Sequence, residues 1–497
     1  METGASLAGR GNIRLRCYLP FYTAEQPFAQ FRQSFREQSL WREESFPFRD
    51  DSRVYDHVLS LMNMRPSEHA VCYSWRYCGP LPPAAGETEQ LPWDLTFDNR
   101  KGLKVNFSIG SIYAHVFTTC VGILSYELSV ERASLGDSLE RLTLFQNAIK
   151  HIGGWNKERV TCRNKPERPV YLGNAFSRIL QGTNRSIRFF KADKEGGRPD
   201  QALLYSYLMY KDAGEQELRQ MACRMARGDA PDYMPSETML ASCRSLFDGV
   251  YYYCTLEGCA FAVRYAEGSH SSYIRDPETI RQTFAFYHFL CLYQHYSLIF
   301  YTMKVAKELP SDTGIYLSDS SCAERMEQLI VDINTFLMKS DLATVSHLQN
   351  HNRFYADCRR ALNIEADKQS LRSGFEYLEN IQSGIRRSER EEIRQREKEE
   401  AEKRRQEEEE QEKKRDGRLN ITLFLIAVFT VIGDGYASVE RMGEIFKRMQ
   451  SGVLSIQDIV FLVLFVFILG FLCWPLVKKL RKRRKKGAER IDRPESQ

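Results

Sequence analysis

The segment Gly173–Arg188 gathers the residue types that bind phosphate groups. Arginine side chains, amides and small hydroxyls are the donors that a phosphate-bearing ligand requires. The segment lacks the Gly-Lys-Thr/Ser signature of a Walker loop. It therefore predicts a ligand pocket, with an ordinary polar surface loop as the alternative. The candidate ligand-binding residues are Asn174, Arg178, Asn184, Arg185 and Arg188.

Asp434 is a single acid that follows a stretch of apolar residues near the C-terminus. An acid near the end of a membrane span normally faces water or a neighbouring helix, because exposing it to lipid costs about 2.5–3.5 kcal/mol. A ring of such acids in an oligomer favours cations. Asp434 is thus a pore-lining candidate, and Asn420 and Thr422 are further candidates at the other end of the same stretch. The alternative is that Asp434 lies in an external turn.

Catalytic and metal-binding motifs are missing from the chain. There is no nucleophile elbow, no HExxH helix and no kinase signature, so no catalytic residue is assigned and we expect no enzyme. The closest cysteine pairs, Cys72/Cys78 and Cys254/Cys259, lack a second Cys or His pair at zinc-site spacing. No metal ligand is therefore assigned. The scattered cysteines are interpreted as small buried residues in a reducing cytosol.

Two apolar stretches near the C-terminus predict a membrane hairpin. Ile459–Val477 is uncharged throughout and would span about 28 Å as a helix, close to the hydrocarbon thickness of a bilayer. Leu419–Ile432 is shorter and reaches spanning length only when extended to Val439. Basic residues precede the first stretch and follow the second, which predicts that both termini are cytoplasmic. The alternative is a soluble helical hairpin.

The residues before this hairpin predict one mixed α+β domain. Ile13–Tyr22 and Ala70–Tyr77 are strand-like, Tyr251–Val263 resembles a β-hairpin, and Pro277–Leu309 is a long helix with few polar positions. A buried core helix is favoured there over a third membrane span, with His288 and His295 as core histidines. A weak similarity between two hairpin-plus-helix segments hints at two related halves.

A long helical stalk is predicted after this domain, with a break around residues 340–352. Most residues from Arg386 to Arg418 are charged, and Glu and Lys/Arg recur at i,i+4, which favours a coiled-coil-like helix over a disordered linker. The predicted domains are residues 1–320 (halves about 1–160 and 161–320), a stalk at 321–418, a hairpin at 419–477 (spans about 419–439 and 457–477) and a basic tail at 478–497.

The layout of the chain resembles that of CorA-like magnesium transporters. A cytoplasmic body, a long helix entering a first span, a short loop, a second span and a basic tail beginning at Lys478 are the features in common. The Gly-Met-Asn triplet of the family is absent, and Gly433-Asp434-Gly435 stands in its place. The resemblance is closer to CorA-like effectors of bacterial antiviral (type III CRISPR) systems that lack this triplet. It implies a homo-oligomer, a pentamer in the family.

The function expected from these features is a homo-oligomeric channel of the inner membrane. A ligand bound to the cytoplasmic domain would gate it, with a signalling nucleotide or a divalent cation as the candidate ligand and membrane lipid as a partner. The alternatives are a membrane-anchored scaffold or sensor, and a divergent divalent-cation transporter. The net charge of +5 on 497 residues is small, so no direct nucleic-acid binding is expected.

Overall fold

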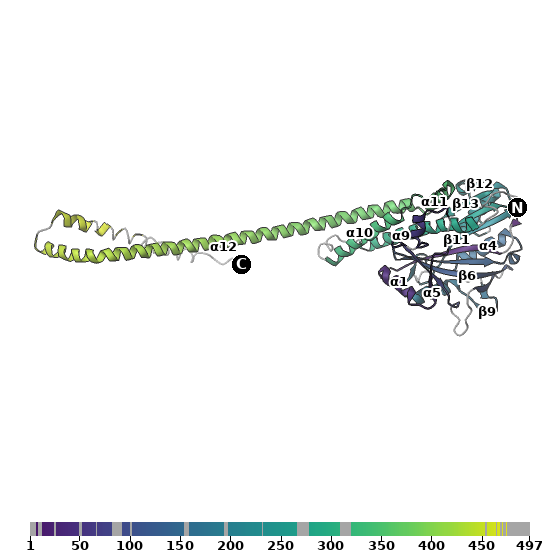
Figure 1. Ribbon diagram of the computed structural model, residues 1–497, viewed down its shortest axis with the longest axis horizontal. Coiled ribbons are helices and arrows are strands. Elements are labelled where there is room, and N and C mark those ends of the chain that lie inside the picture. The colour runs from purple at the N-terminus through teal and green to yellow at the C-terminus, as the bar shows by residue number, and fades with distance from the viewer. Residues whose placement is uncertain are drawn as a thin grey trace, which may run out of the picture. The chain divides into compact units, whose positions relative to one another are not determined.

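The computed structural model separates the chain into two compact units, Met1–Arg387 and Ser388–Gln497. The first contains the sheet and most of the helices (Figure 1). The residues that the structure describes are 6–7, 12–23, 26–48, 52–65, 67–81, 92–99, 102–153, 159–192, 197–230, 232–265, 278–308, 320–452, 455–463, 465–467, 470 and 474.

One mixed sheet of 14 strands forms the centre of the first unit, with the order β12-β13-β14-β11-β2-β7-β6-β5-β8-β9 along its main path. The β11–β14 pair is parallel, and the neighbouring pairs along this path are antiparallel. The strands on the path are β2 (Ile13–Tyr22), β5 (Trp93–Asp98), β6 (Lys104–Phe117), β7 (Val121–Val130), β8 (Arg159–Cys162), β9 (Lys165–Pro169), β11 (Leu203–Lys211), β12 (Arg244–Phe247), β13 (Val250–Thr255) and β14 (Gly258–Arg264). Those off it are β1 (Ser6–Leu7), β3 (Trp41–Glu44), β4 (Cys72–Tyr77) and β10 (Arg188–Phe189).

Strand β2 shows that the sheet is buried on both faces. Leu15, Cys17 and Leu19 pack into one hydrophobic core, whereas Tyr18 packs into a second core on the opposite face. Successive side chains of a strand point to opposite faces, and a strand covered on both faces is apolar nearly throughout. The prediction of a strand at Ile13–Tyr22 is confirmed.

Helices cover both faces of the sheet. The first core receives side chains of α1 (Phe28–Arg36), α4 (Leu139–Lys150), α5 (Leu172–Thr183) and α6 (Glu215–Arg227). The second core receives those of α2 (Asp56–Leu61), the π-helical turn η1 (Thr279–Phe284), α9 (Ala285–Glu308), α10 (Ser320–Ser340), α11 (Gln349–Ala361) and the start of α12 (Ile364–Gln450). Two further short helices are α3 (Arg132–Leu135) and α7 (Glu237–Ser242).

Helix α9 is the core helix that the sequence predicts. Its residues from Ala285 to Leu298 are all buried, and it contacts α10 and α11. His288 lies with its ring centroid 5.8 Å from those of both Tyr18 and Tyr205. Burial lowers the pKa of His288 to about 3, so its imidazole is neutral at physiological pH. This confirms the interpretation of His288 as a core histidine.

Two breaks separate α10, α11 and α12. The predicted break at 340–352 is confirmed, because α10 ends at Ser340 and α11 begins at Gln349. The second break follows α11 directly, where Asn363 adopts a left-handed conformation with φ of 55°. Asparagine tolerates this region better than most residues, which allows the chain to turn before α12 begins.

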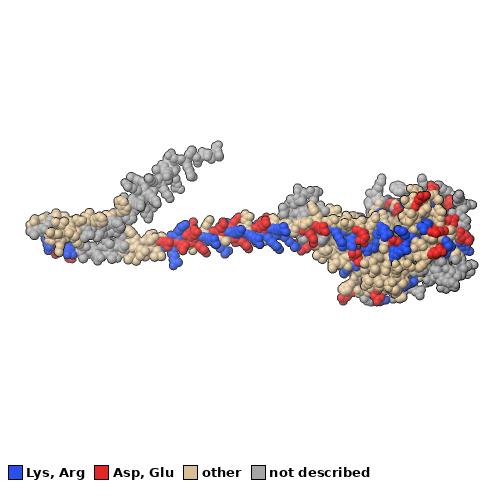
Figure 2. Space-filling view, turned by 90° about the horizontal axis from the view of Figure 1, so that it is seen from above, with Lys and Arg blue, Asp and Glu red and all other residues tan. Residues whose placement is uncertain are grey.

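The second unit contains the charged part of α12. Ion pairs at i,i+4 join Lys413 to Glu409 at 3.9 Å and Lys414 to Glu410 at 3.8 Å. Lys and Arg side chains interleave with Asp and Glu along this helix (Figure 2). The helix prediction for the charged segment is confirmed, since such pairs support a helix that has no apolar face to bury.

The predicted membrane hairpin is contradicted. Among the described residues, no helix combines the length and the apolar character needed to cross a bilayer. The apolar run Leu419–Ile432 is not a helix of its own: it lies inside the 87-residue helix α12, which continues through charged turns to Gln450. Parts of the second stretch and the whole basic tail, 478–497, lie outside the described residues.

Three predictions are corrected by this finding. The fold class is not an α+β domain joined to a two-helix transmembrane hairpin, but a large mixed sheet with helices on both faces and a long charged helix. The description of the chain as a transmembrane, CorA-like ion channel loses its structural basis. The inner-membrane localisation with two spans loses it for the same reason.

Candidate functional site

An open cavity of about 440 Å³ lies where β12, β13, α6 and α11 meet. We call it the arginine pocket, because Arg227, Arg244 and Arg360 border it. Arg227 is the last residue of α6, Arg244 the first of β12, and Arg360 lies in the last turn of α11. Cavities of roughly 300–1,000 Å³ are typical of small-molecule sites. The pocket is thus large enough for a ligand of that class.

Each acid of the arginine pocket already has a cationic partner. Asp357 Oδ1 accepts a hydrogen bond of 2.8 Å from Arg360, and Glu257 Oε2 lies 2.5 Å from Lys150 Nζ. Arg244 is exposed and makes no hydrogen bond or ion pair within the described part of the chain. Arg360 is thus paired with Asp357, and Arg227 Nε donates to Asp229 at 2.7 Å, so the positive charge available to an anion at this border is that of Arg244.

Three cysteines form the inner wall beside this pocket. Cys254 Sγ lies 3.1 Å from Cys259 Sγ and 3.2 Å from Cys358 Sγ, and all three sulfurs lie within 4.8 Å of one another. We call these residues the thiol cluster. Cys254 is half-buried and lines the arginine pocket, whereas Cys259 and Cys358 are buried. All the cysteines that the structure describes are free thiols.

The β13–β14 hairpin places two of these thiols side by side. Cys254 and Cys259 are register partners, so their side chains project from the same face of the sheet. The turn is held by Thr255, whose hydroxyl accepts from the backbone N–H groups of Glu257 and Gly258 at 3.0 and 3.2 Å. A Cβ at Gly258 would lie 2.3 Å from the carbonyl oxygen of Leu204, so only glycine lets β14 approach β11.

The thiols of the cluster have shifted acidities. Burial by itself raises the pKa of Cys254, but hydrogen bonds from the Cys259 and Cys358 thiols outweigh it and lower this pKa to about 6. Burial raises the pKa of Cys259 and of Cys358 well above the ordinary thiol value. Cys254 is thus the thiol of the cluster that loses its proton most easily, because its two neighbours can donate to the thiolate.

Three consecutive residues of α11 face three different features. Cys358 joins the thiol cluster, Arg359 points away from it, and Arg360 borders the arginine pocket. Successive residues of an α-helix are about 100° apart, since 3.6 residues make one turn. A small rotation or shift of α11 would therefore move all three contacts together.

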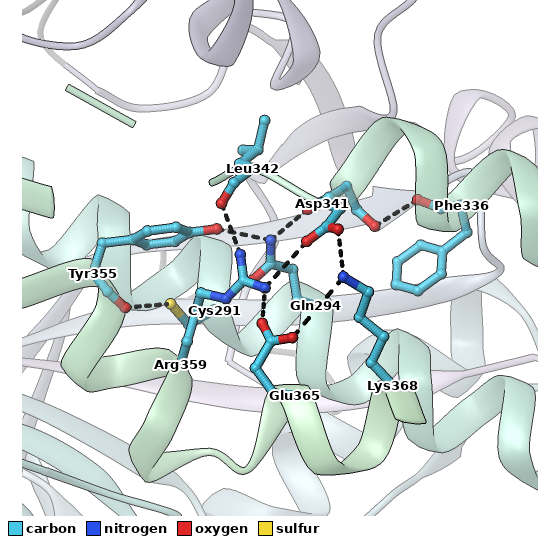
Figure 3. Close-up of polar contacts among 10 residues, drawn as sticks. Cys291, Gln294, Phe336, Asp341, Leu342, Tyr355, Arg359, Glu365 and Lys368 are labelled. Carbon is cyan, nitrogen blue, oxygen red and sulfur yellow. Dashed lines mark hydrogen bonds and ion pairs between the residues drawn. The ribbon is translucent and has the colours of Figure 1, made fainter. Parts of the chain in front are cut away.

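Arg359 belongs to an ion-pair network that holds the first turns of α12 (Figure 3). Its guanidinium donates to the Leu342 carbonyl at 2.7 Å, to Asp341 Oδ1 at 3.2 Å, and to Glu365 of α12. Lys368, also of α12, donates to Asp341. The side chain of Arg359 is 12% exposed, whereas those of Asp341 and Glu365 are 38% and 67% exposed, so the cationic side of the network is shielded from water and the acidic side is not.

Helix α9 is tied to the same place through neutral groups. Gln294 Nε2 donates to the Ser340 carbonyl at 2.5 Å and to the Tyr355 hydroxyl at 2.8 Å (Figure 3). Cys291 lies one turn earlier in α9, and its thiol contacts the Tyr355 carbonyl at 3.8 Å. The network thus joins α9, α11 and the start of α12 around one residue, Tyr355.

A second cavity, of about 170 Å³, is lined mainly by aromatic rings. His115 lies in its wall, with its ring nitrogens 2.8 Å from the Ser74 hydroxyl and 2.9 Å from the Ser125 hydroxyl. Burial, aided by Arg16, lowers the pKa of His115 to about 3. Such an imidazole is a weak base, which does not suit it to activate Ser125 as a nucleophile at neutral pH.

The structure spreads the candidate ligand residues of Gly173–Arg188 over α5 and the following turn. Asn174 accepts from Arg198 at 3.4 Å, and Arg178 is exposed on α5. Asn184 is buried, and its amide is used within the fold: Nδ2 donates to Gln26 at 2.7 Å and Oδ1 accepts from the Ser186 hydroxyl. None of the candidates lines either of the two cavities described above.

The two remaining arginine candidates are exposed, and Arg188 donates to the Arg185 carbonyl oxygen at 2.8 Å. Among the pore candidates, Asn420 and Thr422 are exposed on α12, and the Thr422 hydroxyl donates to the Arg418 carbonyl at 2.9 Å. Asp434 lies in the same helix, but its side chain is outside the described residues. The roles predicted for all these residues stay predictions.

The thiol cluster and the arginine pocket were missed from the sequence. The sequence predicts no metal site at the pair Cys254/Cys259, because no second pair follows at zinc-site spacing. Its third partner, Cys358, comes from a helix about a hundred residues later in the chain. Only the tertiary packing of α11 against β13 brings it there.

Comparison of the chain with protein-family models, with curated proteins and with solved structures gives no match. The resemblance to CorA-like proteins therefore stays a prediction.

Proposed function

We propose that the first unit is a ligand-binding sensor that takes a phosphate-bearing ligand in the arginine pocket. The observation that carries this proposal is the arrangement of three arginines around a cavity of about 440 Å³: Arg244 is exposed, and Arg227 and Arg360 are each paired with one acid that a phosphate could displace. Guanidinium groups bind phosphate oxygens in pairs of charge-assisted hydrogen bonds, which makes arginine the preferred phosphate ligand. A signalling nucleotide is the candidate ligand.

The output of this sensor is the state of the first turns of α12. A ligand that engages Arg360 pulls on α11, and the neighbouring Arg359 holds Glu365 of α12 through the ion-pair network. Binding would therefore tighten or release this network in proportion to the difference in affinity between the two states. The proposed sensor shares ligand binding with the ligand-gated channel that the sequence predicts, but it includes no membrane pore.

The test is calorimetric titration of the full chain with a panel of phosphate probes: inorganic phosphate, AMP, ATP and cyclic di-AMP, with adenosine as the probe that lacks phosphate. We expect at least one phosphate probe to bind and adenosine not to bind. Arg244→Ala should weaken binding about 10- to 100-fold, because it removes a charge-assisted hydrogen bond worth about 1.5–3 kcal/mol. Hydrogen exchange of residues 364–371 should change on binding.

Arg178→Ala is the matched control, since Arg178 is an exposed arginine of α5, outside the arginine pocket. It should bind the probe as the unaltered chain does. If Arg178→Ala loses binding and Arg244→Ala keeps it, the ligand lies at Gly173–Arg188 and the pocket proposal is wrong. If no phosphate probe binds at millimolar concentration, the sensor function is wrong as stated.

A further inference from the structure

The thiol cluster has the composition of a metal centre, and its sulfurs lie close enough together to share one ion. In a tetrahedral zinc site the Zn–S distance is about 2.3 Å, which puts neighbouring sulfurs about 3.8 Å apart. The sulfur of Cys254 is 3.1 and 3.2 Å from its two neighbours, and all three sulfurs lie within 4.8 Å of one another. Movements of roughly half an ångström by each sulfur atom would bring all three sulfurs within bonding distance of one ion.

The elements that present these thiols are rigid. Cys254 and Cys259 are register partners in the ladder of a hairpin, and Cys358 is on the buried face of α11. The phenol of Tyr252 donates to Asp357 at 2.7 Å, which fixes the hairpin to α11 two residues from Cys254 and one residue from Cys358. Sites built on strands and helices hold their ligands more precisely than sites on loops.

Ordinary core packing explains a single buried cysteine but not this convergence. Alanine or valine would fill the same space equally well, whereas here three sulfurs from β13, β14 and α11 lie within 4.8 Å of one another. A fourth cysteine, Cys291 of α9, adjoins this group, because a hydrogen bond with its side chain helps to raise the pKa of Cys358. Thiolates select thiophilic ions such as Zn²⁺ and Cu⁺ over Mg²⁺ and Ca²⁺.

We propose that Cys254, Cys259 and Cys358 together bind one thiophilic metal ion, with Zn²⁺ as the first candidate. The side of the cluster at Cys254 opens to the arginine pocket, so a fourth coordination position faces that cavity. Zinc sites with three protein ligands keep such a position for water or substrate. This proposal stands apart from the sensor function, because it rests on the sulfurs and not on the arginines.

The first experiment measures metal content and thiol protection in the full chain, purified with a reductant and without any phosphate probe. We expect one Zn²⁺ per chain after dialysis against Zn²⁺ and removal of the excess. Replacement by Co²⁺ should produce thiolate-to-metal charge-transfer absorption. Alkylation followed by peptide mass spectrometry should find Cys254, Cys259 and Cys358 protected with the metal and reactive once a chelator has removed it.

Substitutions then identify the ligands. Cys259→Ser and Cys358→Ser should each weaken Zn²⁺ binding at least 100-fold, since each removes a thiolate ligand. Cys72→Ser is the matched control, because Cys72 is equally buried in the same core but lies outside the cluster. It should retain one Zn²⁺. Cys291→Ser should leave the affinity for Zn²⁺ unchanged, because the fourth position faces the cavity and is not filled by Cys291.

Three results would overturn the proposal. The first is less than a tenth of an equivalent of Zn²⁺, Co²⁺ or Cu⁺ per reduced chain. The second is retention of the metal by both Cys259→Ser and Cys358→Ser. The third is a Cys254–Cys259 disulfide that re-forms in the presence of Zn²⁺ with no protection of Cys358. Should the serine variants fail to fold, the alkylation pattern of the unaltered chain decides, because it needs no substitution.

Discussion

Tyr252 and Asp357 join the sheet to α11 by a hydrogen bond of 2.7 Å, from the phenol of Tyr252 to Oδ2 of the carboxylate. Tyr252 is 1% exposed, so this bond lies at the edge of the second core. Burial raises the pKa of Tyr252, and the neighbouring carboxylate raises it further, so the phenol stays protonated and remains a donor. The pair connects the strand of Cys254 to the helix of Cys358.

Tyr252→Phe tests this connection. It removes a hydrogen bond to a charged group, which contributes about 1.5–3 kcal/mol, and we expect a loss of that order in the free energy of unfolding by denaturant titration. Tyr253→Phe is the control, because the Tyr253 hydroxyl makes no hydrogen bond to described residues. Its effect should stay within about 0.5 kcal/mol. Equal losses in both variants would contradict the role given to Asp357.

Arg359→Met tests the ion-pair network at the start of α12. Methionine keeps the apolar stem but leaves Asp341 and Glu365 without their arginine partner. Glu365 is well exposed, and Lys368 still forms an ion pair with Asp341. We therefore expect the free energy of unfolding to fall by about 2–3 kcal/mol, which is less than the loss from breaking a fully buried pair. Amide exchange in residues 364–371 should accelerate by at least tenfold.

Arg372→Met is the matched control for this variant, since Arg372 is an exposed arginine of the same helix. Neither its stability nor its exchange rates should differ from those of the unaltered chain. Faster exchange in both variants would mean that the helix start is loose for reasons other than Arg359.

Gly258→Ala tests the close approach of β14 to β11. The new Cβ would lie 2.3 Å from the Leu204 carbonyl oxygen and 2.8 Å from that of Ala226, and neither backbone atom can move freely. We expect the free energy of unfolding, measured by thermal or denaturant unfolding, to fall by about 1–3 kcal/mol. Gly182→Ala, in α5 with open space around it, should instead be neutral or stabilising by up to about 1 kcal/mol.

His288→Phe tests the effect of pH on stability. The pKa of His288 is lowered to about 3 in the folded chain, so the unfolded chain binds more protons between pH 6.5 and 3. Stability therefore falls as the pH drops through this window, by about 2 kcal/mol at pH 5 for this one group. Phenylalanine should remove that part of the loss and flatten the acid limb of the unfolding profile.

His57→Gln is the control for the pH measurement, since His57 is an exposed histidine. Its profile should overlay that of the unaltered chain. A His288→Phe profile that falls as steeply as the original would show that other groups, such as His115 or the paired carboxylates, dominate the acid limb.

Local patterns in the sequence predict individual elements well. The strand Ile13–Tyr22, the hairpin within Tyr251–Val263 and the core helix within Pro277–Leu309 are all found in the structure. These features depend on residues a few positions apart, whose spacing records which faces are buried. The turn between α11 and α12 was missed, because a single asparagine with positive φ carries little signal.

The prediction of a membrane hairpin in the C-terminal region, which rested on apolar composition, is wrong. The run Leu419–Ile432 suggested an independent span, but in the structure it is part of a continuous helix that starts at Ile364. A window of apolar residues does not say where a helix begins or ends, because charged residues on both sides can belong to the same helix. Length and continuity of the element were the missing information.

The sequence by itself determined individual elements, such as the strand Ile13–Tyr22 and the core helix within Pro277–Leu309, since burial on one or both faces leaves its period in the chain. Tertiary structure alone decided that Cys358 meets Cys254 and Cys259, and that Arg227, Arg244 and Arg360 border one cavity. The physical reason is that these groups come from elements far apart in the chain, and their proximity depends on strand order and helix packing. No local spacing records such contacts.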